Sequence, residues 1–228
     1  MSNRRLPDGS GSAFPILPGS HIPARVAAAK RLLDIAVALA GLVITAPLWP
    51  LLALAIALDS PGPVLFRQMR IGRRHADRTD LFMMLKFRTM RADAEARSGA
   101  VWAARRDPRI TRTGWFLRKT RLDEIPQLLN VLRGDMSIVG PRPERPGFYQ
   151  RLDDAIPFFA ERTSGLRPGI TGLAQVRQGY DTCLDDVRRK VAFDHAYGMR
   201  LTSLKEWFVC DVGLMARTFS VMVAGRGQ

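Results

Sequence analysis

The chain has 228 residues, with 35 lysines and arginines against 21 aspartates and glutamates, and a formal net charge of +14. Hydrophobic residues make up 46% of it, enough to close a core, which excludes a largely disordered chain. Only one segment, residues 35–58, is long and free of charge, which excludes a membrane protein with many spans. The basic balance favours an anionic partner: nucleic acid, an anionic membrane surface or a phosphorylated substrate.

The N-terminal part divides into a polar tail and an apolar segment. Residues 1–22 are rich in glycine, serine and proline and lack hydrophobic periodicity, so we predict a disordered tail. Residues 35–58 form a run of 24 positions without a charged side chain. As a straight helix this run would extend roughly 36 Å, enough for the hydrocarbon core of a bilayer, which is about 30 Å thick.

Two features of the apolar segment favour a re-entrant helix over a single span. Pro47 and Pro50, close to Ala46, lie at its middle, where proline removes backbone hydrogen bonds and bends a helix. Lysine and arginine flank both ends, and the positive-inside rule then places both ends in the cytoplasm. We therefore predict a re-entrant helix-break-helix over residues 23–60. A single proline-kinked span is the alternative.

For the remaining residues, 61–228, we predict a small, mostly helical domain of the α+β class with little sheet. Extended segments are expected at 64–68 and 81–87, and helices at 122–132, 152–162, 184–197 and 201–224. The last helix carries many apolar residues. It either packs in the core or lies in a membrane interface, with Trp207 at the depth of the lipid headgroups.

Asp123 and Glu124 are adjacent carboxylates in a basic stretch, residues 61–150, which holds 19 cationic and 9 acidic side chains. Arg118 and Arg121 are expected to keep Asp123 ionised, and an ionised carboxylate can attack phosphorus. Its neighbour can help to hold Mg²⁺ against a diphosphate, because Mg²⁺ favours one or two carboxylates plus substrate oxygens. The alternative is helix capping, with Asp123 at the N-cap and Glu124 in the first turn.

Further cations occur where they suit phosphate contacts. Lys86 and Arg88 alternate within a predicted extended segment, which would otherwise be a strand with a solvated face. Arg142 lies between Pro141 and Pro143, which fix the backbone on both sides of one guanidinium, as they also would in a plain rigid loop. A non-catalytic basic module would leave the carboxylate pair unexplained, so we predict an enzyme without a nucleic-acid partner.

Taken in chain order, these motifs resemble one family, the bacterial sugar transferases. These are monotopic phosphoglycosyl transferases, which initiate exopolysaccharide, O-antigen and glycan assembly. The resemblance runs from about residue 28 to the C-terminus. The matching motifs are KRLLD at 30–34, GPVLFRQ at 62–68, KFRTM at 86–90, LRKTRLDEIPQLLNVL at 117–132, GDMSIVGPRP at 134–143 and RPGITG at 167–172.

The resemblance implies a short-form enzyme at the bacterial inner membrane, with its catalytic domain on the cytoplasmic face. A re-entrant helix and interfacial amphipathic helices would hold it against the membrane lipids. The reaction implied is transfer of a sugar 1-phosphate from a nucleotide sugar, expected to be a UDP-sugar, to polyprenol (undecaprenyl) phosphate. It would release the nucleoside monophosphate by a ping-pong mechanism.

The resemblance also implies roles for individual residues. Asp123 would be the nucleophile, and Glu124 would assist it and share an Mg²⁺ ion with it. Substrate contacts are expected from six further side chains, namely Lys86, Arg88, Arg118, Arg142, Arg177 and Asp194. Two positions depart from the family pattern: Ala46 stands where many members carry serine at the helix break, and Gly179 where many carry an arginine that Arg177 would have to replace.

Overall fold

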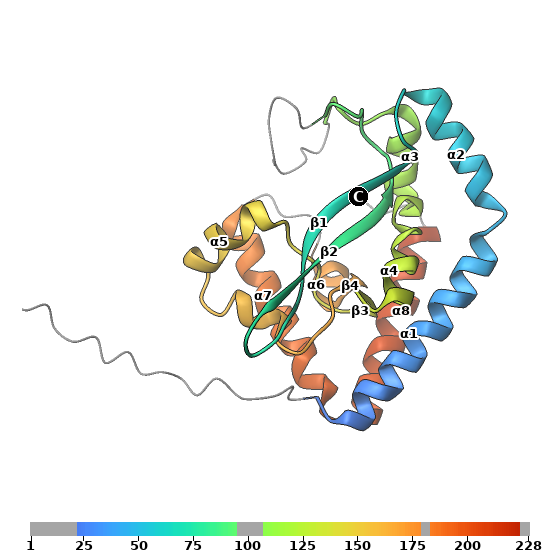
Figure 1. Cartoon of the computed structure of the whole chain (residues 1–228). Coiled ribbons are helices and arrows are strands. Elements are labelled where there is room, and N and C mark those ends of the chain that lie inside the picture. Colours follow the sequence, from blue (N-terminus) through green and yellow to red (C-terminus); the bar gives the residue numbers. More distant parts are fainter. Residues whose placement is uncertain (1–21, 95–106, 179–182, 224–228) are drawn as a thin grey trace, which may run out of the picture.

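The computed structural model describes residues 22–94, 107–178 and 183–223, so most of the predicted tail lies outside it (Figure 1). The described part is mostly helical with few strands, which confirms the predicted α+β class. Its helices are α1 (Ala24–Thr45), α2 (Leu48–Asp59), α3 (Arg112–Thr120), α4 (Gln127–Arg133), α5 (Pro146–Ala155), α6 (Leu173–Arg177), α7 (Leu184–Met199) and α8 (Leu204–Val223). Its strands are β1 (Leu65–Arg74), β2 (Thr79–Phe87), β3 (Ser137–Val139) and β4 (Gly169–Thr171). Three short 3-10 turns, η1 (Leu122–Glu124), η2 (Ala160–Thr163) and η3 (Arg200–Thr202), connect the helices.

The N-terminal helix pair confirms the predicted break but not a membrane. No single described helix has the length and apolarity to cross a bilayer; α1 and α2 reach them only together, as a pair bent by 66°. Ala46 and Pro47 form the break, whereas Pro50 lies in the first turn of α2, where a backbone N–H would have no helical partner. The Thr45 hydroxyl donates to the Gly41 carbonyl at 2.7 Å, within its own helix.

One face of α1 is packed into the domain by residues spaced four apart. Val26, Lys30, Asp34 and Ala38 are buried, because that spacing places them on one side of a helix. Figure 1 shows this helix beside α4 and α8. The inner face therefore belongs to the core of the domain, not to a bilayer.

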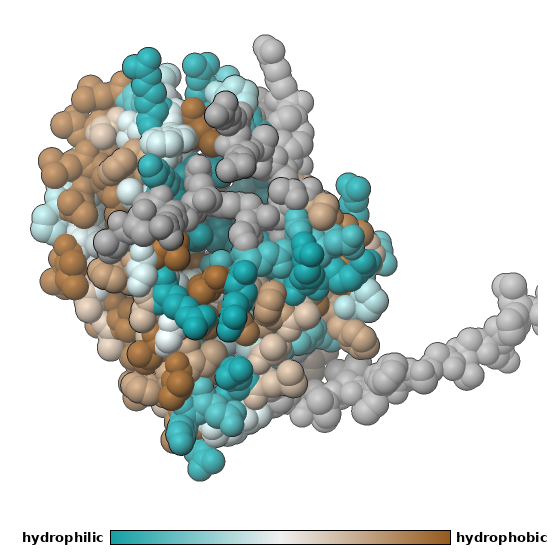
Figure 2. Space-filling view, turned by 180° about the vertical axis from the view of Figure 1, so that it is seen from behind, coloured by the Kyte–Doolittle hydropathy of each residue, from teal (hydrophilic) through white to brown (hydrophobic). Residues whose placement is uncertain are grey.

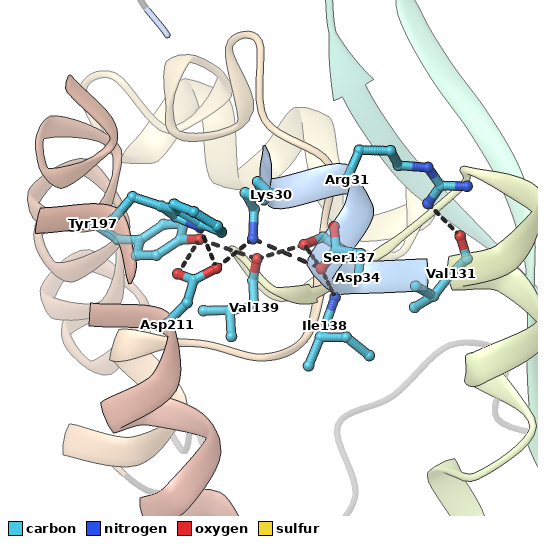
Figure 3. A network of polar contacts seen from close by, with 10 residues as sticks. Lys30, Arg31, Asp34, Val131, Ser137, Ile138, Val139, Tyr197 and Asp211 are labelled. Carbon is cyan, nitrogen blue, oxygen red and sulfur yellow. Dashed lines mark hydrogen bonds and ion pairs between the residues drawn. The ribbon is translucent and has the colours of Figure 1, made fainter. Parts of the chain in front are cut away.

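Lys30 and Asp34 belong to a buried polar network, which Figure 3 shows. Lys30 Nζ donates to Asp211 on α8 at 2.7 Å. Asp34 Oδ1 accepts two hydrogen bonds from β3, one from the Ser137 hydroxyl and one from the Ile138 backbone N–H, at 2.9 Å each. The Tyr197 hydroxyl of α7 donates to Asp211 at 2.9 Å. The network thus joins α1 to β3, α7 and α8, and its buried charges have the partners that burial requires.

The opposite face of the helix pair is apolar and exposed. In Figure 2 hydrophobic residues gather along the edge of the molecule that α1 and α2 form. Its exposed members are Leu32, Leu39, Val43, Ile44, Leu48, Leu51, Leu54 and Leu58, and further large apolar side chains are exposed on α3 (Trp115, Phe116) and α8 (Phe208, Val209, Val212, Phe219). Trp207, in contrast, is buried and donates to Asp211 at 2.8 Å, so of the two alternatives the one that placed it at headgroup depth is wrong.

The hairpin of β1 and β2 confirms the extended segments predicted at 64–68 and 81–87. Its antiparallel ladder runs from the Leu65–Phe87 pair to the Arg74–Thr79 pair, so β1 is longer than predicted. One side chain of α4 closes the outer edge of β2: the Asn130 oxygen accepts from Leu85 N at 3.0 Å, and its amide donates to Met83 O at 2.9 Å. This side chain satisfies backbone groups that an edge strand otherwise leaves open.

Candidate active site

Asp123 and Glu124 lie in a tight turn between two helices, not at a helix cap. α3 ends at Thr120, and Arg121 adopts a left-handed conformation with φ +57° before the 3-10 turn η1 begins. Neither η1 nor α4 has a side-chain cap, and Pro126 precedes α4. The predicted single helix over 122–132 is therefore divided, and the helix-capping interpretation of Asp123 was wrong.

Glu124 is held by three cations from different parts of the fold. Its Oε1 accepts from Lys86 Nζ on β2 and from Arg142 Nη2 in the segment after β3, at 3.1 Å each. Arg121 Nη1 lies 3.9 Å from its Oε2. The antiparallel hairpin, the left-handed turn and the proline-flanked Arg142 thus converge on one carboxylate.

Asp123 has a different environment, although it is equally buried. It lines the main cavity, and within the described ranges no hydrogen bond or ion pair engages its carboxylate. Its oxygens therefore face the space that a substrate would occupy. The two adjacent carboxylates have separate structural roles, one tied to cations and one directed into the cavity.

The electrostatics separate the two carboxylates as well. Burial raises the pKa of Asp123 to about 6, with Lys86 opposing and Glu124 reinforcing the shift. Burial alone would also raise the pKa of Glu124, but Lys86 and Arg142 outweigh it and hold that pKa well below its usual range. With a pKa of about 6, most of the Asp123 carboxylate is ionised near neutral pH.

The cavity beside Asp123 has a volume of about 380 Å³. Its cationic lining includes Arg70, Lys86, Arg88, Arg109, Arg118, Arg121, Arg142, Arg145 and Lys190, and its apolar lining includes Leu65, Phe66, Met90 and Phe148. Burial, with Arg142 nearby, lowers the pKa of Arg70 to about 10, so this guanidinium is still charged at neutral pH. A cavity of this charge suits a ligand with several phosphate groups.

Arg88 reaches the cavity but is bound to backbone. Its guanidinium donates to the carbonyls of Ile56, Ser60 and Pro61, at 3.2, 2.5 and 2.9 Å. These carbonyls lie at and just beyond the C-terminus of α2. Arg88 therefore ties the end of α2 to the strand that carries Lys86.

The structure brings some of the predicted site residues together and leaves others apart. Lys86, Arg118 and Arg142 line the cavity with the carboxylate pair. Arg177 is exposed at the end of α6 and is not among the lining residues, while Gly179 lies outside the described residues. Asp194 is buried behind the cavity wall, paired with Arg162. Sequence reasoning missed Arg70 and Arg162, which no local motif distinguishes from the other arginines.

The donor set at this site is compatible with a magnesium ion only if a ligand completes it. No group of three or more metal-ligating side chains occurs within the described ranges. Asp123 and the less engaged Oε2 of Glu124 are two carboxylate donors, and Mg²⁺ is commonly bound by one or two carboxylates plus phosphate oxygens and water.

Comparison with known proteins places the chain in a family. The family model for bacterial sugar transferases matches residues 25–225. A UDP-N-acetylgalactosamine-undecaprenyl-phosphate N-acetylgalactosaminephosphotransferase of Aeromonas hydrophila is 40% identical over 210 residues, which cover 92% of this chain and 47% of that one. A UDP-glucose:undecaprenyl-phosphate glucose-1-phosphate transferase of Caulobacter vibrioides is 46% identical over 192 residues, covering 82% of this chain and 69% of that one.

A third relative carries the same name as the Caulobacter protein. This transferase of Escherichia coli is 39% identical over 182 residues, covering 79% of this chain and 37% of that one. The chain thus spans less than half the length of the Aeromonas and Escherichia relatives. With nearly all of its length matched by one family model, the chain belongs to the bacterial sugar transferase family, as its ordered motifs predicted, and is an enzyme of the phosphoglycosyl transferase kind.

Proposed function

We propose that this chain transfers a sugar 1-phosphate from a UDP-sugar to undecaprenyl phosphate and releases UMP, initiating a surface polysaccharide or glycan. The relatives named above use substrates of these two classes. The observation that carries the proposal is the contrast between the two carboxylates: Glu124 is held by three cations, whereas Asp123 faces the cavity. A nucleophile needs such an open position beside groups that neutralise phosphate charge.

In the first step an Asp123 oxygen attacks the sugar-bearing phosphorus. A bond from carboxylate oxygen to phosphorus forms, the bond from that phosphorus to the bridging oxygen breaks, and UMP leaves with the electron pair. Arg118 and Arg142 line the same cavity and would neutralise the negative charge that develops on the phosphoryl oxygens. Glu124, held by Lys86, fixes the position of the turn that carries the nucleophile.

In the second step an oxygen of undecaprenyl phosphate attacks the same phosphorus. The acyl phosphate bond breaks, Asp123 returns as a carboxylate, and the product is a diphosphate linking lipid and sugar. Mg²⁺, if held by Asp123 and Glu124, would neutralise charge on the donor diphosphate.

A position on the cytoplasmic face of the inner membrane agrees with this chemistry. The exposed apolar residues of α1, α2, α3 and α8 provide a surface that a bilayer can cover, and α2 leads directly to the strand beside the cavity. At 12 residues, α2 extends about 18 Å, roughly half of a bilayer core and headgroup layer. We therefore propose a re-entrant pair over residues 23–60 and the catalytic domain over 61–228.

The activity is tested with purified chain in detergent, undecaprenyl phosphate, Mg²⁺ and a panel of radiolabelled UDP-sugars. Wild-type chain should release UMP and, without acceptor, retain label on protein. Asp123→Asn should lose both signals, while Asp185→Asn, on an exposed part of α7, should keep them. UMP release by Asp123→Asn at the wild-type rate would contradict the role of Asp123, and acceptor-dependent turnover without any labelled protein would favour a single-step transfer.

The topology is tested by single cysteines at Arg25 and Arg78 in a chain whose Cys183 and Cys210 are replaced by serine. Both positions are exposed; Arg25 lies at the start of α1, and Arg78 lies beyond the end of α2. A re-entrant pair leaves both cysteines shielded from a membrane-impermeant thiol reagent in intact cells and reactive after lysis. Labelling of only one of them in intact cells would show a full span.

A further inference from the structure

Asp194 and Arg162 form a buried ion pair on the far side of Arg142 from the cavity. Arg162 Nη1 donates to Asp194 Oδ2 at 2.8 Å, and their side chains are only 7% and 3% exposed. Neither residue lines the main cavity; Asp194 and Arg162 instead border a small cavity of about 20 Å³ with Arg142 and Gln175. A carboxylate in this position does not reach a substrate in the main cavity.

The same Arg162 nitrogen also contacts the segment that carries Arg142. Arg162 Nη1 donates to the Arg142 carbonyl at 3.2 Å. The Arg142 side chain then extends the other way, and its Nη2 donates to Glu124 at 3.1 Å. With its amide oriented to satisfy both neighbours, Gln175 accepts from Arg142 Nη1 at 3.3 Å and donates to the Ile170 carbonyl at 3.0 Å.

The pair lies between two separate parts of the core. Asp194 is on α7 and Arg162 on η2, next to an apolar cluster formed by Leu152, Ile156, Phe159, Val187 and Val191. Arg162 lies over the Phe159 ring, with its guanidinium carbon 4.6 Å from the ring centre. β3, which leads to Arg142, belongs instead to the cluster packed around α1, α4 and α8. The contact from Arg162 to the Arg142 carbonyl therefore bridges the two clusters at the catalytic wall.

We infer that Asp194 and Arg162 are positioning residues, which hold Arg142 against Glu124 and do not contact substrate. This inference rests on the proposed function for its catalytic consequence and differs from the substrate contact that the family resemblance implied for Asp194. Without Asp194 the buried guanidinium of Arg162 lacks its counter-charge and moves from its place. Because Pro141 and Pro143 restrict the backbone on both sides, a shift at the Arg142 carbonyl displaces the whole residue.

The test follows the Arg142 side chain itself, because its bond to Glu124 is what Asp194 and Arg162 would hold in place. In the absence of substrate, NMR of ¹⁵N-labelled arginine side chains measures how fast the Arg142 guanidinium protons exchange with solvent, and the Arg142 signal is assigned by its loss in Arg142→Lys. The rate of labelled-protein formation from a radiolabelled UDP-sugar is then measured in wild type, Asp194→Asn, Arg142→Ala and the double variant.

In Asp194→Asn the Arg142 guanidinium protons should lose their slow exchange, because Arg142 is no longer held against Glu124. The rate should fall in Asp194→Asn and in Arg142→Ala, and the double variant should be no slower than Arg142→Ala, because both substitutions disturb the same contact. Asp185→Asn, on the exposed side of the same helix, should leave the exchange and the rate unchanged. If Asp194→Asn fails to fold, Arg162→Met with Asp194→Leu removes both charges together and should show the same loss of slow exchange.

Two results would overturn the inference. One is an Asp194→Asn chain whose rate falls while the Arg142 protons keep their wild-type exchange. The other is a double variant in which the rate losses of the two substitutions multiply, as expected if Asp194 contacted substrate independently. A wild-type chain that forms no labelled protein would contradict the proposed function alone, because the substrate-free exchange measurement still decides whether Asp194 acts through Arg142.

Discussion

Lys30 Nζ lies 2.7 Å from Asp211 Oδ2, an ion pair between residues 181 positions apart that fixes the N-terminal helix to the C-terminal one. The two side chains are 11% and 2% exposed, so solvent does little to screen them. The same ammonium lies 3.9 Å from Asp34. One cation thus serves two carboxylates in the core, and the attachment of α1 to the domain depends on it.

Lys30→Met should destabilise the fold by roughly 3–5 kcal/mol, because it leaves two buried carboxylates without a counter-charge. Thermal unfolding in detergent measures the loss. Arg188→Met is the control, since it breaks an exposed ion pair with Asp185 and should change stability by less than about 0.5 kcal/mol. Equal effects of the two substitutions would contradict the structural role of Lys30.

Asp123→Asn should make the protein more stable at pH 8, by up to about 3 kcal/mol in the absence of divalent ions. The pKa of Asp123 is raised to about 6 in the folded chain from 3.8, so its ionisation opposes folding. The stability that its protonated form contributes is present below pH 4 and is lost as the pH rises through 6. The advantage of the variant should therefore disappear near pH 4 in a series of unfolding measurements.

Glu124→Gln should have the opposite effect. Lys86 and Arg142 would lose the carboxylate that both of them contact, which costs roughly 3–5 kcal/mol at neutral pH. Asp123→Asn and Glu124→Gln each replace a carboxylate by its amide at adjacent positions. Unfolding of both variants under identical conditions therefore compares the environments of the two carboxylates directly. A stabilised Glu124→Gln chain would contradict the ion pairs described here.

The rate of the first half-reaction should fall in acid. The kcat/KM for the UDP-sugar reports the ionisation of the free enzyme, and only ionised Asp123 attacks phosphorus. We expect the rate to increase tenfold per pH unit at low pH and to level off near pH 6. Asp185→Asn should give the same profile as wild type, and a profile that levels off near pH 4 would show that burial does not control this carboxylate.

Arg88→Ala should weaken the fold without abolishing donor binding. The substitution removes three hydrogen bonds to carbonyls at the end of α2, including the one to Ser60, at a cost of roughly 1–3 kcal/mol. Hydrogen exchange should accelerate at the C-terminus of α2, while the KM for the UDP-sugar changes less than in Arg142→Ala. A large increase in KM with unchanged exchange would identify Arg88 as a substrate contact.

Much of the fold was predictable because local rules control it. Proline marked the break at Pro47, and Gly134 ends α4 with φ +92°, as expected for a helix that stops at glycine. The division of the 122–132 helix was not predictable, since it depends on the left-handed conformation of Arg121, which few non-glycine residues adopt. The spacing of apolar positions in the last helix also could not show that Trp207 is buried. Its burial depends on its partner Asp211, which is held by Lys30 of α1 and Tyr197 of α7.

The site was predictable as a set of residue types but not as a geometry. The sequence placed two carboxylates near many arginines, and local motifs singled out several of them as phosphate contacts without ranking them. Only tertiary packing distinguishes Arg142, which faces Glu124, from Arg88, which binds backbone, and from Arg177, which is exposed. Asp194 required the fold most of all, because its partner Arg162 is distant in sequence.

The contact of Asn130 with the edge of β2 sets the alignment of the carboxylate turn. Its amide group bonds to Met83 and Leu85, and successive residues of a strand point to opposite sides. If α4 slid along the hairpin by one residue, Asn130 would meet backbone groups that point away from it. Lys86 directly follows Leu85, so the uncharged side chain of Asn130 also determines which residue of β2 places its amine at Glu124.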